Sequence, residues 1–180
     1  GCVGLPTASS ERRVAHKSGG TLQARLASDI DDVDPGLDYL AAGWEIQYAV
    51  GCKLLNYPDQ SGPAGGDLQP EAATGYPRVS NGGRTYTFTI RRGYHFANGE
   101  KVTAASFAAA YNRDANARFQ SPAQFFLTDL VGAQDVIRGK RQTISGITAK
   151  ANSIRFTLTH PAPDFLSRTA LPFFQAIPTT

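Results

Sequence analysis

The stretch Ser80–Phe107, SNGGRTYTFTIRRGYHFANGEKVTAASF, has the most regular pattern in the chain. Aromatic and aliphatic residues at positions 86, 88 and 90 alternate with threonines, which is the period of a strand with one apolar face. The preceding Asn81–Gly83 segment consists of residues that accept a positive φ. We therefore predict a hairpin with arms at Tyr76–Ser80 and Arg84–Arg91 and an aromatic inner row.

A helix is predicted after this hairpin. A turn at Asn98–Gly99 ends the strand region, and Thr103 is suited to cap the first turn of a helix. Val102 and Phe107 are spaced to contact each other as a hydrophobic staple. We expect the helix to end near Arg113.

Other elements follow from the same periodicities. Asp34-Pro35-Gly36 has turn chemistry, and Leu40, Trp44 and Tyr48 or Ala49 are spaced for one face of a helix. The predicted strands are Thr21–Ala27, Gly146–Lys150 and Ile154–Thr159, and the predicted helical segments are Tyr39–Val50, Pro122–Leu130, Ala133–Arg138 and Ala162–Thr169. Hairpins and crossovers together predict an α/β class of mixed α+β character, with a mixed sheet.

The composition allows a folded domain and argues against several classes of protein. The chain has 180 residues, of which 41% are hydrophobic, so a core can form and disorder is not expected. The net charge of +3 comes from scattered basic residues without a patch, so we expect no nucleic-acid partner. No run of apolar residues has the length of a membrane span.

The N-terminal residues suggest attachment to a membrane. Residues 6–20 are small and polar without a period, and we expect a flexible tether over residues 1–19. The Gly1-Cys2 start is similar to the end of a bacterial lipoprotein processing site, which makes Cys2 a candidate lipid anchor. A free Cys2 and a Cys2–Cys52 disulfide are the alternatives, and Cys52 otherwise has the surroundings of a small buried residue.

Catalytic motifs are not found. His16, His95 and His160 share no spacing typical of metal ligands, and there is no nucleophile elbow, phosphate loop or dinucleotide fingerprint. The cluster Asp29, Asp31, Asp32 and Asp34 lacks the central Gly and closing Glu of a calcium loop. Turn formation and helix capping account for this cluster, more firmly at Asp34 than at Asp29. We predict no catalytic residue, no metal site and no cofactor.

Four ordered blocks carry a resemblance to a known family. They are GGTLQARLASDIDDVDP from residue 19, QPEAATGY from residue 69, the Ser80–Phe107 stretch, and GITAKANSIRFTLTHPAPDFLSRTALPFFQAIP from residue 146. Together they resemble the extracytoplasmic solute-binding proteins of peptide and nickel ABC transporters, the family 5 solute-binding proteins. Ser106 stands where the family usually has Asp, and Glu71 takes the place of an acidic residue in the second block.

The resemblance implies the N-terminal part of a two-lobed, periplasmic-binding-protein-like fold with a small mixed-sheet subdomain. Residues 20–180 would form an incomplete N-terminal lobe, and the second lobe would be absent. The implied function is to capture a small solute, expected to be a peptide, by lobe closure and to deliver it to the permease. No bond is made or broken, so no enzyme activity is expected. The alternatives are a fragment of a secreted hydrolase and a signalling or chaperone lipoprotein with the same fold.

The resemblance also implies a location and a site. The protein would lie outside the cytoplasm, in the periplasm or on the outer face of the cell membrane, and would touch the membrane only through a lipid on Cys2. By the motif match, Asp29 and Ile30 in SDIDDVDP and Phe125 and Phe126 in QSPAQFF would contact the ligand. The alternatives are that Asp29 caps a turn and that the Phe pair is core, the latter being the favoured alternative for Phe125.

Overall fold

The computed structural model describes residues 21, 23–26 and 28–179. Two predictions, the tether at residues 1–19 and the lipid anchor at Cys2, lie outside the described residues.

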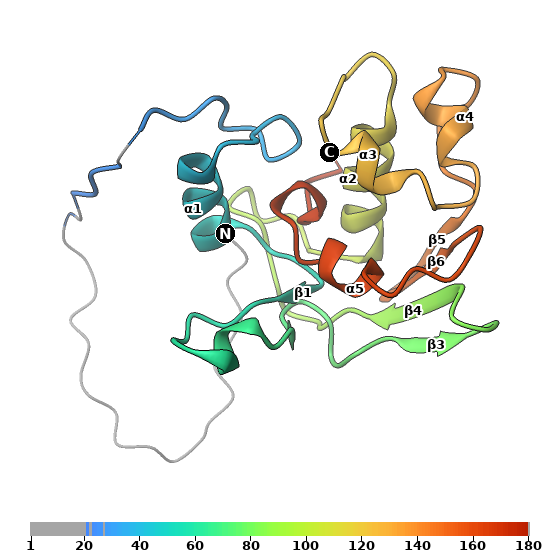
Figure 1. Ribbon diagram of the computed structural model, residues 1–180, viewed down its shortest axis with the longest axis horizontal. Helices are drawn as coiled ribbons and strands as arrows, with labels where there is room; N and C mark the ends of the chain where they lie inside the picture. The colour runs from blue at the N-terminus through green and yellow to red at the C-terminus, as the bar shows by residue number, and fades with distance from the viewer. Residues whose placement is uncertain (1–20, 22, 27, 180) are drawn as a thin grey trace.

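Short helices and strands are mixed along the described part of the chain, with runs of up to three strands or three helices (Figure 1). The helices are α1 (Ala41–Val50), η1 (Pro63–Gly66), α2 (Ala104–Ala115), α3 (Gln124–Leu127), α4 (Ala133–Ile137), α5 (Phe165–Arg168) and η2 (Pro172–Phe174). The strands are β1 (Leu55–Asn56), β2 (Gln69–Pro70), β3 (Arg78–Ser80), β4 (Thr85–Thr89), β5 (Ile147–Lys150) and β6 (Ser153–Thr157). The predicted α/β class of mixed α+β character is confirmed.

The main sheet has the strand order β3-β4-β6-β5. Strand β4 pairs with β3 through Tyr86 and Val79, and with β6 through Phe88 and Ile154. The predicted hairpin is confirmed, and Asn81 at its turn has a φ of 54°, followed by two glycines that also have positive φ. All pairings of the described strands are antiparallel, so the expectation of a mixed sheet is wrong.

The core lies between this sheet and α2. Phe88 and Phe156 are fully buried and meet edge to face with ring centroids 6.0 Å apart. Tyr111 of α2 contacts Phe156 at 4.8 Å and stacks on Phe174 of η2 at 4.4 Å. Because burying one large apolar side chain is worth about 1.5–3 kcal/mol, the alternating row of β4 is explained by packing.

The start of α2 follows the sequence prediction. Thr103 is the N-cap, and the backbone N–H of Thr103 donates to the hydroxyl of Ser106 at 3.1 Å. Ser106 therefore supplies an acceptor at the position where the family usually has Asp. Val102 and Phe107 are both buried, as the hydrophobic staple predicts. The helix ends at Ala115, two residues beyond the predicted end.

Two further predictions are wrong. A strand is expected at Thr21–Ala27, but the described residues of this segment form no strand and are exposed. None of the described strands pairs with them. Helix α1 forms, but its buried residues are Ala42, Gly43 and Gln47, whereas Leu40 is exposed. Gln47 can be buried because its Nε2 donates to the backbone oxygen of Val33 and its Oε1 accepts from Gln175.

Candidate ligand-binding surface

Five aromatic side chains, which we call the aromatic row, contact one another between the start of α1, η2 and α3. They are Tyr39, Trp44, Phe173, Phe126 and Phe125. The Tyr39 ring stacks on Phe173 at 5.9 Å, and the Trp44 ring meets Phe173 edge to face at 5.4 Å. Phe126 contacts Phe173 at 6.1 Å and Phe125 at 5.5 Å.

The aromatic row is buried in its middle and open at both ends. Phe173 is fully buried, whereas Tyr39 is 56% exposed and Phe125 is 78% exposed. Trp44 and Phe126 lie in between and pack against the core. The two exposed rings, Tyr39 and Phe125, are joined through the packed rings of Phe173 and Phe126. The row therefore offers an apolar wall with a rigid base.

The two predicted phenylalanines have different surroundings. The core alternative that was favoured for Phe125 is wrong, since most of its ring is open to solvent. Phe126 packs against the core while its ring also joins Phe125 to Phe173. Sequence spacing did not separate these roles, because α3 is only four residues long and has no repeated face.

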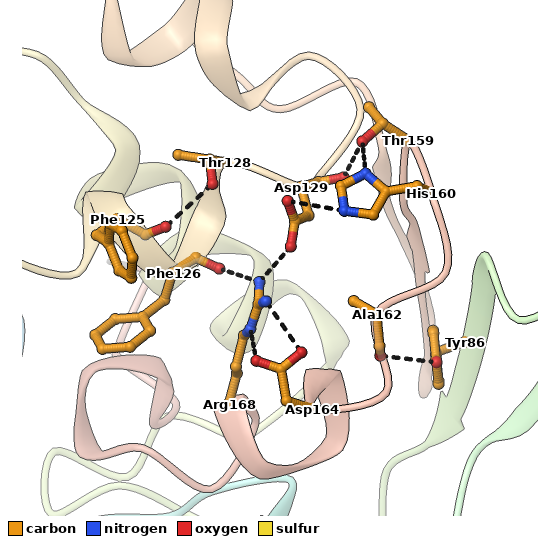
Figure 2. A network of polar contacts seen from close by, with 10 residues as sticks. All are labelled: Tyr86, Phe125, Phe126, Thr128, Asp129, Thr159, His160, Ala162, Asp164 and Arg168. Atoms are coloured by element: carbon orange, nitrogen blue, oxygen red, sulfur yellow. Dashed lines mark hydrogen bonds and ion pairs between the residues drawn. The ribbon is translucent and has the colours of Figure 1, made fainter.

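A network around Arg168 holds α3 in place (Figure 2). The guanidinium of Arg168 donates to Asp129 at 2.8 Å, to Asp164 at 2.9 Å and to the backbone oxygen of Phe126 at 3.1 Å. Asp129 also lies 3.4 Å from Nε2 of His160. These bonds connect α5 to the end of α3 and so determine where Phe126 lies.

The acidic loop before α1 contains the other predicted pair. The carboxylate of Asp29 accepts the backbone N–H of the next residue, Ile30, at 3.0 Å on the exposed surface, whereas a turn-forming Asp accepts the N–H two residues on. Ile30 is half-buried and lines a small pocket of about 240 Å³ together with Gly43 and Ile46 of α1. This contact does not form the turn that the alternative for Asp29 requires, and the Asp29 side chain stays exposed to solvent.

Asp31 connects this loop to the aromatic row, through the helix capping that the sequence predicts for the acidic cluster as a whole. Its carboxylate accepts the backbone N–H groups of Tyr39 at 2.9 Å and Leu40 at 3.4 Å, at the start of α1. The hydrogen bond from Tyr39 is the main reason that the pKa of Asp31 is lowered. The signal in the sequence was the acidic cluster before a predicted helix, which indicates capping without saying which residue caps.

Beneath this cap lies Asp38, which is fully buried. Neither carboxylate oxygen of Asp38 has a hydrogen-bond partner that satisfies it among the described residues. Burial, with a smaller contribution from Asp31, raises the pKa of Asp38 to about 6. Gly43 permits this position, because a Cβ at residue 43 would collide with the Asp38 carboxylate.

The structure does not bring the two predicted pairs into direct contact. Among the contacts of the described residues, none joins Asp29 or Ile30 to Phe125 or Phe126. Their connection runs through Asp31, which holds the backbone of Tyr39, and then through the rings of the aromatic row.

Two further kinds of feature, a metal site and a membrane-spanning helix, are tested on the described part of the chain. Within it, no cluster of three or more His, Cys, Asp or Glu side chains is arranged to hold a metal ion. Among the same residues, no helix has the length and hydropathy needed to cross a membrane.

Comparison with known proteins points in one direction. Residues 67–179 match the family described as bacterial extracellular solute-binding proteins, family 5 Middle. The periplasmic murein peptide-binding protein MppA of Escherichia coli is 34% identical over 109 residues, which are 58% of this chain and 20% of that protein. The oligopeptide-binding protein OppA of Bacillus subtilis is 28% identical over 156 residues, which are 83% of this chain and 27% of that protein.

Solved structures agree with the sequence matches. The structure of the Escherichia coli murein tripeptide binding protein MppA has a TM-score of 0.74 at 27% identity, covering 85% of this chain and 30% of that one. The clavulanic acid biosynthesis oligopeptide binding protein 2 has a TM-score of 0.76 at 27% identity, covering 84% and 28%. The chain thus spans between a fifth and a third of the length of these proteins.

Proposed function

Because the chain belongs to the bacterial extracellular solute-binding proteins of family 5, we propose that it captures a small solute for an ABC transporter. The family match over residues 67–179 is the observation that carries this proposal. The names of the relatives, which include murein peptide-, oligopeptide- and dipeptide-binding proteins, favour a peptide as the solute. In this proposal the permease is the second partner, and transport requires binding and lobe closure without a chemical step.

The aromatic row is the proposed wall of the peptide site in this chain. Aromatic faces contact apolar side chains of different shape, so they suit a protein that binds peptides of varied sequence. Phe125 and Tyr39 provide the exposed faces, and Phe173 and the Arg168 network keep them in place. A peptide lying on this wall would still need a second wall to bury most of its surface.

Asp29 is the proposed polar contact of the same site. Its carboxylate is exposed, and its one hydrogen bond with a described residue comes from the neighbouring N–H of Ile30. A carboxylate has further lone pairs for the ammonium or backbone N–H groups of a peptide. Ile30 would supply an apolar contact beside it.

The experiment that tests this proposal uses the protein as its own gene encodes it. Native mass spectrometry of the freshly purified protein is expected to show a bound mass that disappears on denaturation and fragments as a short peptide. A bound species that does not fragment as a peptide would show that the solute belongs to another chemical class. A protein that carries no ligand and gives no calorimetric signal with a mixture of di- to pentapeptides would contradict capture of peptides.

Two alternatives make different predictions in the same preparation. A secreted hydrolase would turn over generic ester or peptide substrates, whereas a binding protein leaves them intact. A signalling or chaperone lipoprotein would be encoded without permease and ATPase genes beside it.

Attachment to the membrane through Cys2 is the remaining part of the proposal. The Gly1-Cys2 pair is the motif behind this anchor, and the family description supports only a location outside the cytoplasm. Mass spectrometry of the native protein extracted from membranes is expected to find an acylated Cys2. A Cys2–Cys52 disulfide or an unmodified Cys2 would contradict the anchor.

A further inference from the structure

A second cavity lies away from the aromatic row and shares no residue with it. It has a volume of about 500 Å³ and opens between the end of β4, the loop of residues 91–101, the start of α2 and the turn at residues 151–152. Ile90, Tyr94 and Val102 line its apolar part, and Ile90 and Val102 are buried. This volume is within the range of pockets that hold small molecules.

Positive charge surrounds the cavity. Arg91, Arg92 and Lys101 line it, and no Asp or Glu is among the lining residues. Nε of Arg91 donates to the backbone oxygen of Ala73 at 3.0 Å, which holds this side chain at the rim. Arg92 and Lys101 form no hydrogen bond or ion pair with any residue that the structure describes. Three cations at one opening repel each other, and an anion between them would relieve this repulsion.

The start of α2 adds to the same field. Thr103, the N-cap of this 12-residue helix, lines the cavity, and the first turn of α2 has no acidic residue. The N-terminus of a helix carries partial positive charge and favours an anion nearby. His95 also lines the cavity, and its Nδ1 donates to the backbone oxygen of Gly93 at 3.0 Å.

We propose that this cavity binds an amphiphilic anion, meaning one carboxylate or phosphate group on an apolar body. The anionic group would lie among Arg91, Arg92 and Lys101, and the apolar body would cover Ile90, Tyr94 and Val102. Charge alone would not select such a ligand at physiological salt, because exposed ion pairs are screened. Burial of the ligand's apolar body against Ile90, Tyr94 and Val102 supplies the additional affinity. A small inorganic anion has no apolar body and therefore binds weakly.

Octyl phosphate is the probe for this proposal, measured by calorimetry on the protein as its gene encodes it. Inorganic phosphate and octyltrimethylammonium are the matched probes that lack the apolar body or reverse the charge. We expect octyl phosphate to bind with one-to-one stoichiometry, both control probes to bind at least about tenfold more weakly, and affinity to fall as sodium chloride is raised.

The double variant Arg92→Gln and Lys101→Gln removes two cations that have no partner in the described structure. It is expected to weaken octyl phosphate about tenfold or more without changing the thermal unfolding midpoint. The control double variant Arg138→Gln and Lys140→Gln removes exposed cations at the end of α4 and should bind as the unchanged protein does. Equal binding of octyltrimethylammonium, or an unchanged affinity in the Arg92/Lys101 variant, would overturn the proposal.

Vesicles distinguish the sources of such an anion. Co-sedimentation of the Cys2→Ser protein, which carries no lipid, with phosphatidylglycerol vesicles but not with phosphatidylcholine vesicles, lost when Arg92 and Lys101 are also replaced, would identify a lipid headgroup. Binding of free octyl phosphate without co-sedimentation would identify a dissolved solute. Absence of binding in both measurements would reject the site, whatever the outcome of the peptide experiment at the aromatic row.

Discussion

Arg168 and Phe126 are joined by a hydrogen bond of 3.1 Å from the guanidinium to the backbone oxygen, although 42 residues separate them in the chain. The same guanidinium is shared between two carboxylates, Asp129 and Asp164 (Figure 2). The position of the two α3 members of the aromatic row, Phe125 and Phe126, therefore depends on a side chain of α5.

Replacing Arg168 by Gln should loosen α3 and lower the free energy of unfolding by about 2–3 kcal/mol, because charge-assisted hydrogen bonds are lost and Asp129 is left without this partner. Urea denaturation measures this change. Arg155→Gln on β6 is the control, since Arg155 is exposed, and it should change stability by less than about 0.5 kcal/mol. Equal stability of the two variants would show that the network does not support α3.

The two phenylalanines of α3 should separate stability from binding. Phe125→Ala should leave the free energy of unfolding within about 0.5 kcal/mol of the unchanged protein, because the ring is 78% exposed. It should nevertheless weaken the binding of the co-purified peptide by about 1–3 kcal/mol, as expected for an aromatic contact in an interface. Calorimetry measures the affinity, and chemical denaturation measures the stability.

Phe126→Ala is the companion variant. It should lower both quantities, because this ring packs on Phe173 as well as on Phe125. An unchanged affinity in both variants, with the fold intact, would place the peptide site elsewhere.

Asp38 should make stability depend on pH. Its pKa in the folded protein, about 6, is above the ordinary value of 3.8, so the folded state holds this proton more tightly. The contribution is stabilising below about pH 4 and is lost as the pH rises towards 6, so the free energy of unfolding should fall across this window. In Asp38→Asn the fall between pH 4 and 6 should be smaller.

Urea titrations at intervals of half a pH unit measure this difference. Asp114, also buried, has a pKa raised to about 8 by burial and contributes a decline of the same sign over a wider range. The variant is therefore compared with the unchanged protein, in which Asp114 is the same. Identical pH profiles for the two proteins would rule out a titrating Asp38.

Gly43→Ala should destabilise the protein even though it places a better helix former inside α1. In an open helix this change stabilises by roughly 0.5–1 kcal/mol. Here the added Cβ collides with the buried Asp38 carboxylate, and we expect a net loss of about 1–3 kcal/mol. Thermal unfolding measures it, with Gly75→Ala as the control because no heavy atom lies within 4 Å of its Cβ position. A stabilised Gly43→Ala variant would mean that Asp38 moves away freely.

The sequence by itself determined the hairpin, α2 and its cap, because each depends on residues within a few positions of one another. The alternation of β4, the Asn81 turn and the Thr103 N-cap are local, and the structure reproduces them. The family was also readable, since four ordered blocks carry it along the chain.

The tertiary structure alone decided which side chains form a surface. Tyr39 contacts Phe173, and Phe126 contacts Arg168. Arg92 and Lys101 line one cavity. The periodicity of the sequence does not predict these contacts, because the partners belong to different segments of the chain. The tertiary structure also decided that Phe125 is exposed, although the sequence favours a core role for it, and that Asp38 is buried, for which the sequence gives no signal. The physical reason is that burial and ring contact depend on which segments pack together, and the positions of α1, α3 and η2 are set by contacts between segments rather than by their own short sequences.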